Sequence, residues 1–213
     1  MKPPGHPGGT IVAAAEEIRS GKIAIVGGVW FALALLLGAS KILSRAPVPV
    51  IPAILWTLVA IILLAFWWSA SFRARATSID MRSLVAVHLT RFVGIYFLVL
   101  HDRGLLPWAF AVPGGWGDIA VAVAAFAVFA LVPPRGKAAW QVYLLWNMLG
   151  LADILLVVAT AARLALADRD SMIAITHLPL SLLPTFLVPI IISTHVIMLV
   201  RLRAARRRGS DTF

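Results

Sequence analysis

The chain of 213 residues is built from apolar runs whose length matches the hydrocarbon core of a bilayer. Residues 23–40 form a run of 18 without a charged side chain, and residues 171–200 form a run of 30 without Lys, Arg, Asp or Glu. A helix needs about 20 apolar residues to cross a membrane. Charged residues are 13% of the sequence, whereas a soluble domain has about a quarter. The sequence therefore predicts an all-α integral membrane protein.

Prolines, glycines and charges divide the chain into six expected transmembrane helices. They are expected near residues 23–40, 53–71, 83–100, 118–132, 138–162 and 182–200. Residues 105–117 are apolar but contain Pro107, Pro113 and three glycines, and they are too few to cross. This pattern predicts a broken re-entrant or interfacial segment before the fourth helix. Prolines 179, 184 and 189 predict a kink in the sixth helix.

The same division predicts the domains and the orientation. Residues 1–22 are expected to be a disordered or surface segment, residues 23–200 the six-span domain, and residues 201–213 a basic tail. Six spans place thirteen Lys and Arg on the side of both termini and five on the other side. Positive loops mark the cytoplasmic face, so both termini are expected in the cytoplasm, at a cell inner membrane. A signal peptide ending near Gly38 and Ser40 is the rival interpretation of the first run.

Five polar residues lie inside the expected spans, in their inner and middle layers. They are His88, Arg91, Asn147, Asp153 and His195. A charge near the membrane centre costs about 3 kcal/mol on insertion scales, so Arg91 needs a partner, and Asp153 is the acid at the nearest depth. The sequence predicts an intramembrane polar pocket made by these five side chains. The alternative is a structural tie between Arg91 and Asp153 or Asn147 that holds the helices together.

A second polar group is expected at the outer face, and it consists of His101, Asp102, Asp118 and His177. Asp118 follows the run PGGWG and has the place of a helix N-cap. The run matches neither phosphate-binding glycine motif. Four histidines lie at two expected depths in the membrane, His88 and His195 at the inner depth and His101 and His177 at the outer depth. A bis-histidine haem b between helices is therefore one hypothesis.

The composition limits the possible functions without choosing one. There is no cysteine, which excludes disulfides and zinc–thiolate sites, and no catalytic motif or metal site is identified. The basic residues lie in loops and in the tail, so anionic lipid headgroups are expected partners and nucleic acid is not. The leading interpretation is an accessory or binding subunit, with a possible membrane protein partner, or a small-solute carrier without a cofactor. The alternatives are a haem b electron carrier and an intramembrane enzyme of unknown reaction.

Three stretches, RFVGIYFLVLHDRGLLPWAFAVPGGWGD, WNMLGLADILLVV and LPTFLVPIIISTHVIML, resemble a family of uncharacterised bacterial multi-pass membrane proteins. The resemblance covers about the last two-thirds of the chain. The positions that look family-like are Arg91, Gly94, Gly104, Pro107, Pro113, Gly115, Gly117, Asp118, Asn147, Gly150 and Asp153. The resemblance implies a fold type and no reaction.

Overall fold

The computed structural model describes residue 21, residues 25–209 and residues 212–213. Within this part, the protein is helical and has no β-strand, apart from an isolated antiparallel bridge between Arg135 and Thr212. The predicted surface segment 1–22 lies outside the described residues except for Gly21, and so does the start of the first predicted span.

Five helical stretches are long and apolar enough to cross a membrane. They are α3 (Val50–Trp68), the stretch Met81–Asp102, α7 (Trp108–Leu131), α8 (Gly136–Ala167) and the stretch Leu183–Arg208. Met81–Asp102 consists of α5 (Met81–Val87), η1 (His88–Val93) and α6 (Gly94–Asp102), and Leu183–Arg208 consists of η3 (Leu183–Leu187) and α9 (Val188–Arg208). A shorter apolar helix spans Ile25–Ala39. The connections include α2 (Ile42–Arg45), α4 (Ala70–Ser78) and η2 (Asp170–Thr176).

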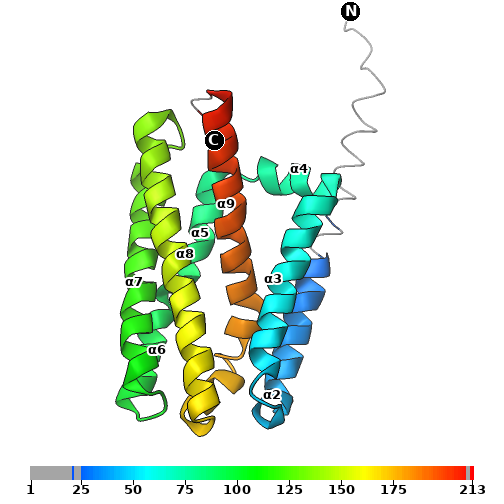
Figure 1. Ribbon diagram of the computed structural model, residues 1–213, viewed down its shortest axis with the longest axis vertical. Coiled ribbons are helices and arrows are strands. Elements are labelled where there is room, and N and C mark those ends of the chain that lie inside the picture. The colour runs from blue at the N-terminus through cyan, green and yellow to red at the C-terminus, as the bar shows by residue number, and fades with distance from the viewer. Residues whose placement is uncertain (1–20, 22–24, 210–211) are drawn as a thin grey trace, which may run out of the picture.

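The helices stand side by side around α9 (Figure 1). The most apolar window of Leu183–Arg208 is 61% buried inside the protein, against 17% for α3, so α9 is central and α3 peripheral. α9 packs against α3 on one side and α8 on the other, and α7 packs against α5, η1, α6 and α8. Large apolar side chains that remain exposed, such as Leu145, Leu149 and Leu156 of α8, point out of the bundle. Such a surface suits lipid rather than water.

The predicted break before the fourth crossing helix is wrong. α7 is one helix from Trp108 to Leu131 with Pro113 inside it, and residues 105–117 form no separate re-entrant segment. Neighbouring helices make prolines and glycines tolerable within membrane helices. The glycines serve packing: a Cβ built on Gly94 would lie 2.4 Å from the backbone oxygen of Gly115, so α6 and α7 cross almost backbone to backbone.

The proline-rich region is irregular at the start of the last crossing helix. The Leu178–Pro179 bond is cis, η3 is a π-helical turn, and Pro189 lies in the first turn of α9. Beyond that turn α9 is helical to Arg208, so the first eight residues of the predicted basic tail continue the helix. The prolines therefore shape the entry into this helix and leave its remaining length regular.

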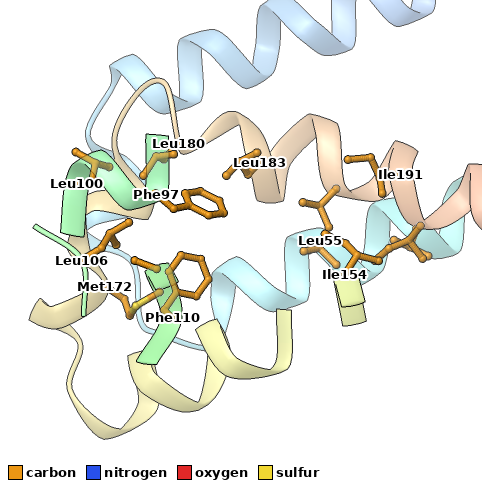
Figure 2. Packing of buried hydrophobic residues seen from close by; sticks show 14 residues of the cluster. Leu55, Phe97, Leu100, Leu106, Phe110, Ile154, Met172, Leu180, Leu183 and Ile191 are labelled. Carbon is orange, nitrogen blue, oxygen red and sulfur yellow. The ribbon is translucent and has the colours of Figure 1, made fainter. Parts of the chain in front are cut away.

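Two apolar clusters fill the bundle at different heights. One contains Phe97 and Phe110, whose ring centroids lie 5.1 Å apart, together with residues of α3, α8 and η3 (Figure 2). The other cluster contains Tyr143 and Met198. It lies nearer the C-terminal ends of α7 and α9. On α7, α8 and α9, and on Met81–Asp102, a short stretch of polar residues separates the positions that belong to the two clusters.

Candidate functional site

The polar stretches of four helices meet in one buried layer between the two apolar clusters. The buried polar residues of this layer are His88, Arg91, Asp118, Asn147, Thr194 and His195. Asp153 joins them with a side chain that is 21% exposed. All five residues predicted from the sequence as an intramembrane pocket thus lie in this layer, together with Asp118 and Thr194.

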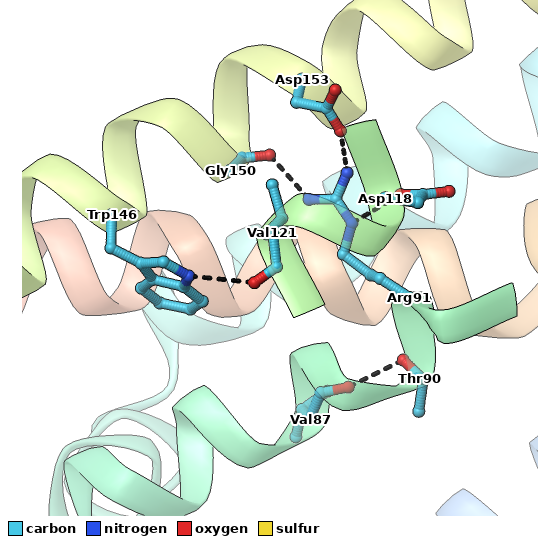
Figure 3. A network of polar contacts seen from close by, with 8 residues as sticks. All are labelled: Val87, Thr90, Arg91, Asp118, Val121, Trp146, Gly150 and Asp153. Carbon is cyan, nitrogen blue, oxygen red and sulfur yellow. Dashed lines mark hydrogen bonds and ion pairs between the residues drawn. The ribbon is translucent and has the colours of Figure 1, made fainter. Parts of the chain in front are cut away.

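Arg91 is the centre of the charged part of the layer (Figure 3). Its side chain is 1% exposed, and Nε donates to Oδ1 of Asp118 at 2.6 Å. Nη1 donates to the carbonyl oxygen of Gly150 at 2.9 Å, and Nη2 pairs with Oδ2 of Asp153. One guanidinium therefore joins η1, α7 and α8. The predicted Arg91–Asp153 contact is present, and Asp118 is a second carboxylate partner that the sequence did not suggest.

His88 and His195 form the other part of the layer. Their ring centroids lie 4.1 Å apart, and both rings pack against Trp146. His195 Nδ1 lies 2.7 Å from Oδ1 of Asn147, whose Nδ2 donates to the His195 carbonyl at 3.1 Å. An amide oxygen only accepts, so Nδ1 of His195 is the donor and its Nε2 is the lone-pair nitrogen. Asn147 thereby fixes the tautomer of His195.

The same reasoning assigns the hydrogen on His88. Its Nε2 lies 3.3 Å from Oγ1 of Thr194, and that hydroxyl donates to the carbonyl of Ile191 at 2.9 Å. Thr194 has used its one hydrogen, so it accepts from His88 Nε2. The remaining ring nitrogens, His88 Nδ1 and His195 Nε2, are buried and have no hydrogen-bond partner among the described residues.

Gly150 connects the charged part to the histidines. Its carbonyl accepts from Arg91, and a Cβ at its position would lie 2.8 Å from Cε1 of His195. The absence of a side chain therefore lets α9 bring an imidazole against the backbone of α8. Gly117 has a similar relation to Asp153, because a Cβ there would overlap Oδ1 of that carboxylate.

A cavity of about 120 Å³ adjoins the charged part of the layer. Its walls are apolar residues of α3, α6, α7, α8, η3 and α9, among them Phe97 and Phe110. Arg91 and Asp118 line it near Ile154 of α8, and Arg169 lines it beyond Ala165. The distance from Ile154 to Ala165 along a helix is about 16 Å. The cavity is thus an elongated apolar space with a buried ion pair at one end.

The chain matches the model of a known family. A family model described as "Domain of unknown function (DUF8737)" matches residues 48–203. The chain belongs to this family. The matched range includes α3 to α8, α9 as far as Arg203 and every residue of the polar layer, and the family's description states no activity. Searches of curated proteins and of solved structures found no match.

The predicted outer-face group does not form as one cluster. The prediction that Asp118 is a helix N-cap is wrong, because Asp118 lies about 15 Å into α7 and pairs with Arg91. His101 Nδ1 lies 3.1 Å from the Leu106 carbonyl, and His177 Nδ1 lies 3.0 Å from the Ile173 carbonyl. Asp102 is exposed. Among the described residues no hydrogen bond or ring contact joins His101 to His177.

The two histidine pairs differ from a haem ligand set. Haem iron lies between its two axial ligands. The rings of His88 and His195 instead contact each other, and at 4.1 Å between centroids they leave no room for an iron atom. His101 and His177 each contact a carbonyl of their own segment. Haem b stays a prediction from the histidine count, and this arrangement of side chains does not favour it.

Proposed function

We propose that this protein binds a small, mainly apolar molecule within the bilayer, as a binding subunit or small carrier. The observation behind the proposal is the elongated apolar cavity that ends at the buried Arg91–Asp118 pair. Small-molecule sites are typically concave, apolar and furnished with a few polar groups that fix orientation. An apolar cavity of about 150 Å³ in another protein stays dry and binds benzene, so a space of this size suits a ring or a short chain.

We further propose six crossings with both termini in the cytoplasm, in an inner membrane. The Ile25–Ala39 helix contacts η3, because Trp30 Nε1 donates to the Thr185 carbonyl at 2.9 Å, and it would be the first crossing. The end of α9, the region of α4 and the α7–α8 connection lie at one end of the bundle, and they contain Arg73, Arg75, Arg135 and the five arginines of residues 201–208. Exposed Arg206, Arg207 and Arg208 would then meet anionic lipid headgroups. A protein partner in the membrane would bind the lipid-facing surface.

The binding proposal can be tested with a cavity-filling substitution. Ala161 lines the cavity, whereas Leu156 of the same helix is 65% exposed. Ala161→Trp should fill the space, and Leu156→Trp is the matched control with the same added ring. The test compound is 4-phenyl-1-butanol, an uncharged molecule with one ring and a short chain.

The readout is the shift of the thermal unfolding midpoint of detergent-purified protein. A ligand that binds only the folded state at 100 times its Kd adds about 2.7 kcal/mol of stability. Wild type and Leu156→Trp should shift upward together, and Ala161→Trp should not shift. Equal shifts in all three proteins would mean that the alcohol acts through the detergent or another surface, and the proposal would be wrong.

A further inference from the structure

We propose that the molecule bound in this cavity is a lipophilic cation, such as an amine with an apolar tail, and that its charge is placed against Asp118. This inference rests on the proposed function and adds the chemical class of the ligand. It follows from the charge balance of the polar layer, from an unpartnered carboxylate oxygen, and from the place of that oxygen in the cavity wall.

The charged part of the layer contains one positive group and two negative groups. Arg91 pairs with both Asp118 and Asp153, and these are its ion pairs among the described residues. His88 and His195 lie in the same layer, but they contact each other, Thr194, Asn147 and Trp146, and neither forms a hydrogen bond or ion pair with a carboxylate among the described residues. With both carboxyl groups ionised, one surplus negative charge lies within the membrane-spanning part of the protein. A single buried charge without a counter-charge is strongly unfavourable.

Asp118 is the place where a positive charge can enter. The residue is 3% exposed, and its Oδ1 accepts from Arg91. Its Oδ2 has no hydrogen bond within the described part of the chain, and Figure 3 shows the carboxylate extending away from Arg91. Asp118 lines the cavity, while Asp153 does not. The side chain of Asp118, with one carboxylate oxygen that accepts no hydrogen bond among the described residues, thus lines an apolar space of molecular size.

The rest of the cavity wall fits the apolar part of such a ligand. Phe97 and Phe110 line the cavity and would contact an aromatic or alkyl group. Arg169 is the other cation in the lining, and its Nη2 donates to the carbonyl of Ser44. It lies about 24 Å along α8 from Asp153, so it does not neutralise the charged layer. An ammonium group at Asp118 with its tail toward Phe97 and Phe110 would balance the charge and fill the cavity.

The test uses three compounds of nearly equal shape and different charge. They are 4-phenylbutylammonium, 4-phenyl-1-butanol and 4-phenylbutyrate. Each is titrated into the purified full chain, and Kd is obtained from the concentration dependence of the thermal midpoint. Wild type should bind the ammonium compound at least tenfold more tightly than the alcohol, which corresponds to 1.4 kcal/mol, and should bind the carboxylate most weakly.

Asp118→Asn removes the surplus charge and keeps the shape and an oxygen for Arg91. In this variant the ammonium and the alcohol should bind within twofold of each other. The matched control is Asp102→Asn, at an exposed position outside the cavity, which should keep the tenfold preference. If Asp118→Asn does not fold, Asp153→Asn makes the same charge change from outside the cavity and should also reduce the preference.

The outcomes separate this inference from the proposed function. Binding of the alcohol without any preference for the ammonium compound would mean that a proton neutralises the carboxylates, and the inference would be overturned while the proposed function stands. A preference that persists in both Asp118→Asn and Asp153→Asn would overturn it as well. Failure of all three compounds to bind wild type would overturn both.

Discussion

Removing Arg91 should destabilise the fold, because its buried side chain joins three helical segments through hydrogen bonds and ion pairs. Arg91→Met deletes the hydrogen bonds to Asp118, Gly150 and Asp153 and leaves two carboxylates without a counter-charge. Polar contacts between membrane helices are worth about 0.6 to 1.7 kcal/mol each, so three of them amount to about 2 to 5 kcal/mol. Breaking a buried ion pair from one side costs about 3 to 5 kcal/mol. The two estimates of the loss in the free energy of unfolding are therefore similar.

The assay is reversible unfolding in mixed micelles by titration with sodium dodecyl sulfate, with Trp fluorescence as the signal. The control is Arg163→Met on α8. Arg163 is exposed and forms no side-chain hydrogen bond or ion pair with the described residues, so its loss should change the free energy of unfolding by less than about 0.5 kcal/mol. Arg91→Met should lower it by at least about 2 kcal/mol.

A compensated variant tests the cause of the loss. Arg91→Met with Asp118→Leu and Asp153→Leu removes all three charges, and replacement of a buried ionic group by apolar side chains is often neutral or stabilising. This triple variant should therefore regain most of the stability lost in Arg91→Met. If Arg91→Met alone is as stable as wild type, the ion pairs do not hold the helices together. If the triple variant is no more stable than Arg91→Met, the loss does not come from uncompensated charge.

The remaining predictions use the same titration. Gly94→Ala should cost about 1 to 3 kcal/mol, because its Cβ would lie 2.4 Å from a backbone oxygen of α7. Gly150→Ala should cost a similar amount, since its Cβ would lie 2.8 Å from the His195 ring, and Gly114→Ala, with its nearest contact at 3.4 Å, is the control for both. Asn147→Leu should cost about 1 to 3 kcal/mol, because it leaves the buried Nδ1 of His195 without a partner. If Gly94→Ala or Gly150→Ala is as stable as Gly114→Ala, the close helix contact inferred at that glycine is wrong.

The sequence was sufficient to predict the helical membrane class and the meeting of five polar residues. Depth along a helix can be counted from its ends, and this places His88, Arg91, Asn147 and His195 in the inner and middle layers. Asp153 lies deeper, so its pairing with Arg91 required a shift of the expected span boundaries. Helices whose polar residues lie at one depth bury them most favourably against each other. This reasoning needs no knowledge of which helices are neighbours, and for that reason it succeeded.

Asp118 was missed because the glycines before it were interpreted as a break. In water, a run such as PGGWG favours a turn, since glycine and proline destabilise a helix. Within a membrane, the same small residues let two helices approach closely. Counting α7 from Trp108 would have placed Asp118 near the depth of Arg91. The cavity had no signal in the sequence, because the residues that line it are apolar like those that face lipid.

Stability alone does not explain why three charged side chains lie in this layer. Each charge is costly within a bilayer, and an apolar layer would pack the same helices without that cost. The charges lie where the cavity ends, and one carboxylate oxygen faces the cavity without a donor. The triple variant separates the two roles, since it should fold like wild type and bind 4-phenyl-1-butanol without any preference for the ammonium compound. If the triple variant keeps this preference, the two carboxylates are not part of the binding site.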